Sequence, residues 1–513
     1  MRSSESWLAL IAVSTVVAGC ARSALDMAPD RPDQPWTPAT TASGEIVAGE
    51  PAPEHVADRG YVLPSNPMLG KLPAPAAVSP GHTYSLVELI DIAQSSNPTT
   101  RIAWDEARNA ALAAGIARSA FLPNLSASVV GGYETSHNGN SLSVVSANSN
   151  QTAKGTISSL SLEWLLFDFG ERSAILETVK QGSVVANIAF TAAHQQVIYK
   201  VSLAFYANAA AQARVRTAAK ALRNARDVEA AAEQRYSHGV GTVVEQAQAR
   251  QATAQANLAQ VQADGAAKDS YLSLLAAMGI SPLAKIKVAD ISNRRLSTAM
   301  QEPIEDVVSE ALARRPDTLA AYAVHEASLA SLRAARAEFL PKLFLSATGS
   351  YTTGSFNVTG IPGVAPQAPT LNLSPHGLGA TVLLGVTIPL YDGGTRDALY
   401  EQAQTNVDRS DAALKEVRDE AVQQVVAAAN AAKTNLSAYD AAQALVSAAQ
   451  TTFDAALQSY RHGVGSITDV TTAETQLLLA ENAATDAYSN VLSAAATLAL
   501  SAGALGAAPQ WSS

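Results

Sequence analysis

The stretch Gln-Arg-Tyr-Ser-His-Gly-Val-Gly-Thr-Val-Val-Glu at residues 234–245 recurs as Gln-Ser-Tyr-Arg-His-Gly-Val-Gly-Ser-Ile-Thr-Asp at residues 458–469. The tyrosine, the histidine, both glycines and the final acid of the second copy lie 224 positions after their counterparts. Leu-Phe-Asp at 166–168 returns as Leu-Tyr-Asp at 390–392 with the same offset. Because equal offsets leave no room for an insertion between these landmarks, the chain is a tandem duplication.

A long run of helical sequence precedes the repeated stretch in each copy. Residues 170–236 and 394–460 contain no proline, and alanine, glutamine and charged residues dominate them. At 1.5 Å per residue, each helix is roughly 100 Å long, far longer than a compact domain needs. We therefore predict two long helical hairpins with their tips near residues 239–241 and 463–465.

The composition of the chain argues against several classes of function. Hydrophobic residues make up 48% of the 513 residues but aromatic residues only 5%, which suits helices packed closely side by side. A net charge of -10 offers no basic stripe for phosphate and argues against nucleic acid as a partner. The chain has no phosphate-binding Gly-x-x-x-x-Gly-Lys-Ser/Thr loop, and His325-Glu326 does not continue to His-Glu-x-x-His. We expect no catalytic site, no cofactor and no metal.

The N-terminus resembles a lipoprotein signal. A short apolar run ends at Val-Ala-Gly-Cys, residues 17–20, and is too short to span a membrane. This box predicts a signal peptide over residues 1–19 and acylation of Cys20, the single cysteine; an ordinary signal peptide with an accidental cysteine is the alternative. Ala21 follows the cysteine where a retention signal would place aspartate, which implies the outer membrane.

The rest of the chain divides at changes of composition. We predict a proline-rich tether at residues 20–80 and a first repeat at 81–285. A linker at 286–302 leads to a second repeat at 303–505 and a tail at 506–513. In each repeat, a short helix precedes a longer one that starts at Asn97-Pro98 or Arg315-Pro316, and Ser85 is the expected N-cap of the first helix.

Four segments change from helical to alternating periodicity. The predicted strands cover about residues 124–134, 155–167, 342–352 and 378–390, joined by loops at 134–154 and 352–376. One face of each strand is apolar and the other is small and polar, which fits lipid on one side and water on the other. Four strands cannot close a barrel around water, and an open edge in hydrocarbon leaves backbone groups unpaired. We therefore predict an oligomer in which each chain contributes four strands.

From about residue 84 to 505, the chain resembles the TolC family of outer-membrane efflux ducts. The motifs that carry this resemblance occur in order in both halves: Phe-Leu-Pro at 121–123 and 339–341, Leu-Phe-Asp-Phe-Gly at 166–170 with Leu-Tyr-Asp-Gly-Gly at 390–394, and the two tips. The family implies a mainly α-helical trimer with a twelve-stranded outer-membrane β-barrel and a periplasmic α-barrel. Its partners are a periplasmic adaptor and an inner-membrane transporter.

The resemblance also assigns candidate residues at the periplasmic mouth: Asp469, Glu245, Tyr460 and Tyr236. Gly465 stands where a closing arginine would be expected and Thr472 where a second ring aspartate would be, so closure is expected to rest on packing and weaker hydrogen bonds. Three copies of Asp469 around an axis would attract cations. The alternative for both acids is that they cap the helix that restarts after the tip.

The tips themselves are expected to contact the adaptor through Gly239, Val240, Gly241, Gly463, Val464 and Gly465. The turn alone also accounts for the glycines, since it needs positive φ angles. His238 and His462 are either pH sensors or solvated cap residues. Trp164, Tyr133 and Tyr351 are candidates for an aromatic girdle at the membrane interface, with ordinary strand contacts as the alternative.

Three functions remain open on sequence alone. The first is the passive exit duct of a tripartite efflux pump, and the second is the exit duct of a type I protein secretion system. The third is a coiled-coil envelope protein that transports nothing, although it does not account for the alternating strands. The transported substrate cannot be read from the wall of a wide duct.

Overall fold

The computed structural model describes residues 28–29, 31–33, 35–51, 61–71, 78–79, 81–138, 149–291, 296, 303–354 and 377–506. The chain divides into two compact units, Met1–Ala76 and Ala77–Ser513. The expected signal peptide, Cys20 and residues 507–513 of the expected tail lie outside the described residues. No helix in the described ranges combines the length and the apolar character that a membrane crossing requires.

The N-terminal unit contains one short antiparallel pair, β1 (Pro38–Thr40) and β2 (Ile46–Pro51). Thr41 and Glu45 close the turn through a backbone bond of 2.8 Å. The hydroxyl of Tyr61 donates to the carbonyl of Asp33 at 2.7 Å and ties the next segment to the unit. The sequence predicted no regular element in this tether. The strands β1 and β2 are too short to establish a periodic apolar pattern, so periodicity does not reveal them.

The second unit opens with two short helices in each repeat. In the first repeat, α2 (Leu86–Ser96) precedes α3 (Pro98–Ser119), and in the second, α6 (Ile304–Arg314) precedes α7 (Pro316–Ala337). Ser85 caps α2 and forms a capping box with Glu88, which confirms the predicted N-cap. The linker between the repeats returns to this point, because β6 (Lys287–Val288) pairs in parallel with β3 (Thr83–Tyr84).

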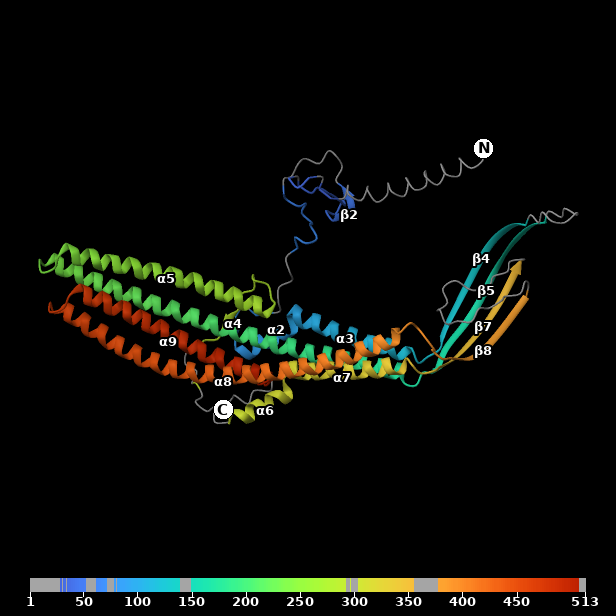
Figure 1. The fold of residues 1–513 in the computed structure, drawn as a ribbon. Helices are drawn as coiled ribbons and strands as arrows, with labels where there is room; N and C mark the ends of the chain where they lie inside the picture. Colours follow the sequence, from blue (N-terminus) through green and yellow to red (C-terminus); the bar gives the residue numbers. More distant parts are fainter. Residues whose placement is uncertain are drawn as a thin grey trace. The chain divides into compact units, whose positions relative to one another are not determined.

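The long hairpins are the largest elements of this unit. The first consists of α4 (Glu171–Ser237) and α5 (Val243–Met278), and the second of α8 (Thr395–Arg461) and α9 (Ile467–Ser501). Both α4 and α8 are 67 residues long, as the absence of proline predicted. Figure 1 shows the two hairpins side by side with their tips at the same end. Buried alanines line the contacts and allow the helices to pack closely.

Polar side chains also join the two repeats where α4 packs against α9. Lys220 Nζ lies 2.6 Å from Glu481 Oε1, and Arg214 pairs with Asp486. The hydroxyls of Tyr199 and Thr497 are 3.0 Å apart. These contacts fasten the first hairpin to the second along their length.

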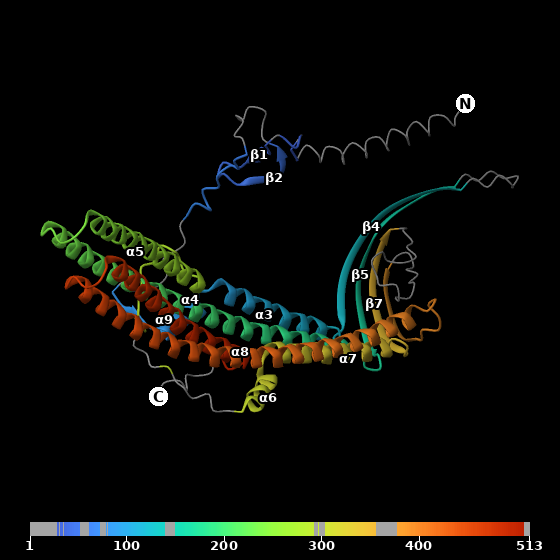
Figure 2. The same cartoon turned by 60° about the vertical axis from the view of Figure 1, so that its left-hand side comes forward.

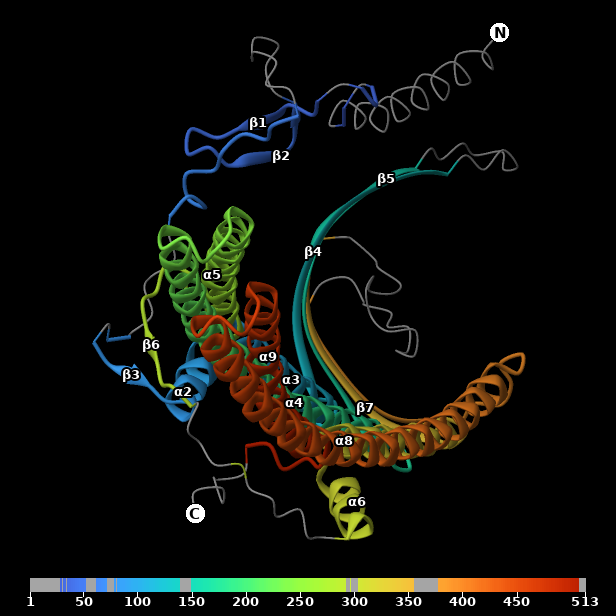
Figure 3. The same ribbon diagram turned by 90° about the vertical axis from the view of Figure 1, so that its left-hand side faces the viewer.

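The four remaining strands form one antiparallel sheet. They are β4 (Asn124–Asn138), β5 (Ser149–Phe167), β7 (Lys342–Gly354) and β8 (Gly377–Thr387), in the order β4-β5-β7-β8. Figure 1 shows the strands at the end of the unit opposite the hairpin tips, and Figures 2 and 3 show that they curve. Within the described residues, β4 pairs only with β5 and β8 only with β7, so both outer edges of the sheet are free.

The two faces of the sheet differ as predicted. In one cross-strand row, Leu125 pairs with Leu162, which pairs with Ala347 and through it with Val382. This apolar face is open, and Leu378 on β8 is 86% exposed. The opposite face carries small polar side chains, among which Ser159, Thr348, Ser350 and Thr352 are buried.

The strand boundaries correct several predictions. β4 runs to Asn138 and β5 begins at Ser149, because the backbone ladder continues through polar residues that composition had assigned to the loop 134–154. β7 likewise ends at Gly354 instead of 352. β8 covers 377–387 instead of 378–390, and Pro389, which cannot donate to a ladder, follows shortly after its end. The register shifts between Leu165 and Phe167, so Phe167 pairs with Leu343 and the alternation stops before Leu166.

Candidate functional site

The two hairpin tips share one turn geometry. Gly239 and Gly463 have φ angles of 75° and 80°, which favour glycine. In the first tip, the amides of Val240 and Gly241 donate to the carbonyl of Arg235 at 3.0 and 2.9 Å. The second tip repeats this arrangement on the carbonyl of Ser459. The repeated sequence thus encodes a repeated helix end.

The second glycine of each tip is needed for space. A Cβ atom at Gly241 would lie 2.9 Å from the backbone nitrogen of Tyr236, and one at Gly465 would lie 2.9 Å from the Cβ of Ser459. The absence of an arginine at 465, where the family resemblance led us to expect one, therefore has a local cause. This turn has no room for a side chain at that position.

The two acids assigned to the mouth cap the helices that follow the tips. Glu245 accepts hydrogen bonds from the amide of Thr242, whose hydroxyl accepts from the amide of Glu245. Asp469 and Ser466 form the same capping box at the start of α9. The capping interpretation accounts for the position of both acids in a single chain.

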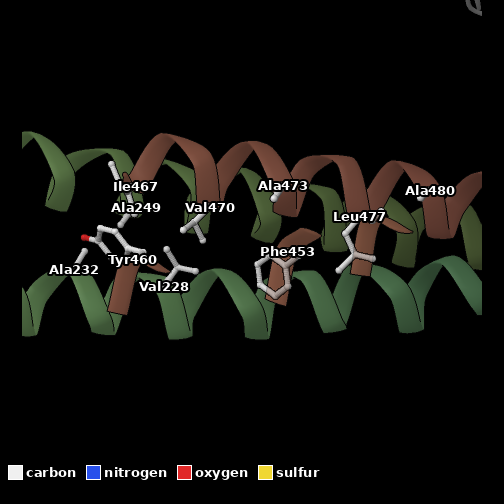
Figure 4. Close-up of a cluster of buried hydrophobic side chains, with 11 residues drawn as sticks. Val228, Ala232, Ala249, Phe453, Tyr460, Ile467, Val470, Ala473, Leu477 and Ala480 are labelled. Atoms are coloured by element: carbon white, nitrogen blue, oxygen red, sulfur yellow. The ribbon is translucent and has the colours of Figure 1, made fainter. Parts of the chain in front are cut away.

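The two repeat-equivalent tyrosines have different surroundings. Tyr460 is completely buried, whereas Tyr236 is 43% exposed. Figure 4 shows the Tyr460 ring between the two hairpins, among apolar side chains from α4, α5, α8 and α9. The buried members of this group, here called the tip cluster, are Val228, Ala232, Ala249, Ala449, Phe453, Tyr460, Ile467, Val470, Ala473, Leu477 and Ala480.

Arg235 is a member of this site that sequence reasoning missed. Its guanidinium lies 4.9 Å from the centre of the Tyr460 ring, and its Nη1 donates to the Tyr460 carbonyl at 3.2 Å. Its Nη2 donates to the carbonyl of Val240 at 3.3 Å. Burial and the nearby Glu245 raise the pKa of Tyr460, and Arg235 opposes that rise. The second copy has Ser459 at the equivalent position, so comparing the repeats could not identify this arginine.

The outermost part of each tip is apolar and open. Val240 is 66% exposed and Val464 is 83% exposed. His238 bonds back to its own helix, with Nδ1 2.7 Å from the carbonyl of Gln234. That contact fits the cap interpretation of His238.

The other end of each long helix carries an aspartate–arginine pair. Asp168 lies 2.7 Å from Arg172 Nε, and the Arg172 Nη1 donates to the carbonyls of Leu165 and Ala120. Burial opposes ionisation of Asp168, but hydrogen bonds and the charge of Arg172 outweigh it and lower the pKa of Asp168. The guanidinium also stacks over Phe121, so the Phe-Leu-Pro and Leu-Phe-Asp motifs meet here.

The second repeat has the same pair in a more open form. Arg396 Nε lies 3.2 Å from Asp392, and the Asp392 side chain is more exposed than that of Asp168. Sequence reasoning missed both arginines. A signal was present, because each follows its aspartate by four residues in both copies.

The expected interface aromatics lie on the sheet. The indole of Trp164 donates to the carbonyl of Phe121 at 3.0 Å, which places it beside the junction between the helices and the sheet. Tyr133 and Tyr351 are exposed on the strands β4 and β7. In the ranges that the structure describes, no three histidine, cysteine or acidic side chains gather closely enough to hold a metal ion.

Comparisons with known proteins agree with this architecture. Protein CyaE of Bordetella pertussis is 27% identical over 348 residues, covering 67% of this chain and 68% of the relative. The outer membrane protein OprJ of Pseudomonas aeruginosa is 24% identical over 380 residues, covering 74% and 75%. The crystal structure of the outer membrane protein VceC from Vibrio cholerae has a TM-score of 0.68 at 19% identity, covering 82% of this chain and 96% of that one.

The family model for outer membrane efflux proteins matches residues 89–280 and 307–504, which are the two repeats. This match and the relatives confirm the resemblance to the TolC family. The chain therefore belongs to the outer membrane efflux protein family, whose fold is that of outer-membrane channels.

Proposed function

We propose that three copies of this chain form the exit duct of a tripartite efflux system in the outer membrane. The duct passively conducts substrates that an inner-membrane pump and a periplasmic adaptor deliver. One observation carries the proposal: a curved sheet with an open apolar face and two free edges is joined directly to helices of 67 residues. A sheet of this kind suits lipid, and helices of this length suit the periplasm.

Closure of the sheet requires further copies of the chain. The free edges of β4 and β8 would each leave backbone groups unpaired in hydrocarbon, at a cost of several kcal/mol per group. Pairing β8 of one copy with β4 of the next removes both edges. Three copies supply the twelve strands of the family's barrel, with Leu378 and its row of apolar neighbours facing lipid.

The mouth of the duct lies at the hairpin tips in this proposal. Tyr460 and the tip cluster pack the two hairpins of each protomer together, and Tyr236, the equivalent residue at the first tip, is partly exposed. Glu245 and Asp469 cap their helices and, in three copies, add an acidic ring that favours cations. Replacing Asp469 by asparagine in the reconstituted duct should reduce its selectivity for cations. If the selectivity does not change, Asp469 acts only as a helix cap.

The adaptor docks on the tips. The exposed Val240 and Val464 lie between glycines in both turns, so bare backbone and small apolar side chains meet the partner. Adaptor helices can approach closely where no long side chain intervenes. The predicted contact residues are Gly239, Val240, Gly241, Gly463, Val464 and Gly465.

The lipid anchor completes the proposed assembly. Acyl chains on Cys20 would insert in the outer membrane, and Trp164, Tyr133 and Tyr351 would form the girdle at its interfaces. The chain carries no enzymatic activity of its own in this proposal. Energy for transport comes from a proton-driven or an ATP-driven inner-membrane partner.

Deleting the gene separates efflux from protein secretion. Increased sensitivity to drugs or metal ions, with an unchanged set of secreted proteins, supports the efflux duct. Loss of one exported polypeptide without a change in sensitivity supports a type I secretion duct instead. If neither changes and the purified protein does not conduct ions across planar bilayers, the chain is a non-transporting envelope protein.

A further inference from the structure

One carboxyl group in the tip half of the second hairpin is buried without a partner. The side chain of Glu474 lies on α9, and only 7% of the residue is exposed. Its Oε1 has no hydrogen-bond partner in the part of the chain that the structure describes. An ionised carboxylate without a partner is costly in such surroundings, whereas the neutral acid is tolerated.

The position of Glu474 links it to the packing of both hairpins. It lies on the buried side of α9, one turn from Val470 and from Leu477, which belong to the tip cluster. The helix α9 packs against α8 and α4 and also meets α5. A charge at Glu474 would therefore act on the seam that holds the two hairpins of a protomer together.

Two charged residues on the neighbouring helices, Arg250 and Asp454, have other partners. At the same distance from the tip, Arg250 on α5 lies within 3.9 Å of Glu229 and Glu233 on α4. On α8, Asp454 accepts from Gln450, and Tyr460 lies closer to the tip. Burial raises the pKa of Glu474 to about 7.

The first repeat provides a natural contrast. The position equivalent to Glu474 is Arg250, which lies 224 residues earlier and has a side chain that is 58% exposed. Asp469 caps the start of α9, which explains an acid at that position. Capping does not explain Glu474, which lies further along α9 on its buried face. The buried acid is thus a feature of the second hairpin only.

We propose that Glu474 is a proton-binding site that keeps the two hairpins packed at their tips while it is neutral and loosens them when it ionises. The consequence for conductance rests on the proposed function as a duct; the consequence for stability does not. Opening exposes the carboxyl to water and returns it to its ordinary titration range. Because the packed state prefers the protonated form, rising pH shifts the equilibrium towards the loosened state.

The size of the effect follows from linkage. A carboxyl whose pKa lies near 7 in the packed tip and near 4.5 in water shifts the packing equilibrium by on the order of tenfold to a hundredfold per chain between pH 5 and pH 8. In the unfolded chain the pKa is also ordinary. The native state therefore loses stability as pH rises from about 4.5 to about 7, and this loss is complete above pH 7.

The test compares wild type with Glu474→Gln and Glu474→Leu in the full-length protein. Glu233→Gln is the matched control, because it removes an exposed carboxyl at a similar level of the first hairpin. Conductance is measured in planar bilayers, and thermal unfolding in detergent, at pH 5, 6, 7 and 8. We expect wild type and Glu233→Gln to gain conductance severalfold between pH 6 and pH 8, and both Glu474 variants to lose this rise.

The thermal measurement stands apart from transport. Both Glu474 variants should unfold at a higher temperature than wild type at pH 8, and the gap for Glu474→Gln should close at pH 5, where wild type is neutral at this position. A pH-dependent rise in conductance that persists in both variants, or a stability gap that is the same at pH 5 and pH 8, overturns the proposal. Absence of conductance at every pH, with the predicted stability gap, contradicts the duct function and leaves the proton site standing.

Discussion

The guanidinium of Arg235 stacks on the ring of Tyr460 at 4.9 Å and donates to the carbonyl of the same residue at 3.2 Å. One residue belongs to the first repeat and the other to the second, so this contact joins the two hairpins at their tips. Because Tyr460 is fully buried, the cation–π contact is shielded from water and is stronger than it would be at an exposed site.

Replacing Arg235 by alanine should loosen the tips. We expect a loss of about 1–3 kcal/mol in the free energy of unfolding, since the substitution removes a stacked cation and two charge-assisted hydrogen bonds. Thermal unfolding measures this loss, and Arg461→Ala, at an exposed position near the second tip, is the control. Equal unfolding temperatures for the two variants would show that the contacts of Arg235 do not stabilise the packing of the tips.

The tip glycines should respond to alanine in the opposite way from a glycine inside a helix. Gly241→Ala and Gly465→Ala place a Cβ about 2.9 Å from neighbouring atoms and should destabilise the hairpins. Gly182 lies inside α4, where a Cβ atom would have no neighbour within 4 Å, so Gly182→Ala should stabilise the protein by roughly 0.5–1 kcal/mol. Chemical unfolding of the three variants measures the predicted loss of stability at 241 and 465 and the predicted gain at 182. Tolerance of alanine at 241 and 465 would refute the tight turn.

The two helix–sheet junctions should differ in sensitivity. Arg172→Ala leaves the buried Asp168 without its cation, which should cost about 3–5 kcal/mol. Arg396→Ala acts on the more exposed Asp392 and should cost about 1 kcal/mol or less. Unfolding in denaturant compares the two, and equal losses would contradict the difference in burial.

The same junction predicts a response to acid. The pKa of Asp168 is lowered in the folded chain, so its contribution to stability is present above the ordinary pKa near 4 and is lost as pH falls through the folded value. Arg172→Ala removes the side-chain hydrogen bond and the charge that lower this pKa, whereas the backbone hydrogen bond from residue 172 remains. The stability difference between wild type and Arg172→Ala should therefore shrink below about pH 4, and a difference that is constant with pH would exclude the ion pair as its source.

Acylation of Cys20 is tested by labelling. Cells that express the wild-type chain with a labelled fatty acid should incorporate the label into this protein, and Cys20→Ser should abolish incorporation because the chain has no other cysteine. A labelled Cys20→Ser protein, or an unlabelled wild type, would favour the ordinary signal peptide.

Sequence periodicity captured the large elements because each is long and occurs twice. The 67-residue helices follow from uninterrupted alanine-rich sequence, and the apolar row through Leu162 and Ala347 follows from strict alternation. The strand ends were harder to predict from the sequence, because the ladder from Glu134 to Asn138 depends on backbone pairing and not on side-chain polarity. The short β1 and β2 pair gave no pattern because strands of 3 and 6 residues are too short to establish a period.

The site was harder to predict than the fold. The tip glycines and capping acids were evident because both copies share them, and the geometry agrees with the turn and cap interpretations that the sequence analysis gave for them. Arg235 and Glu474 have no chemical equivalent in the other copy, where Ser459 and Arg250 stand. In sequence each resembles an ordinary charged residue on a helix surface, and only the packing of four helices shows that they lie at the seam.

The mass of the detergent-purified protein tests the central claim most directly. Light scattering, corrected for bound detergent, should give a particle of several chains, because the free edges of β4 and β8 close only between copies. The proposed function sets the expected number at three, which is the number that the twelve-stranded barrel of the family implies. A particle of one chain that stays folded, with the apolar row around Leu378 protected from membrane-soluble labels, would contradict the duct and the function proposed for it.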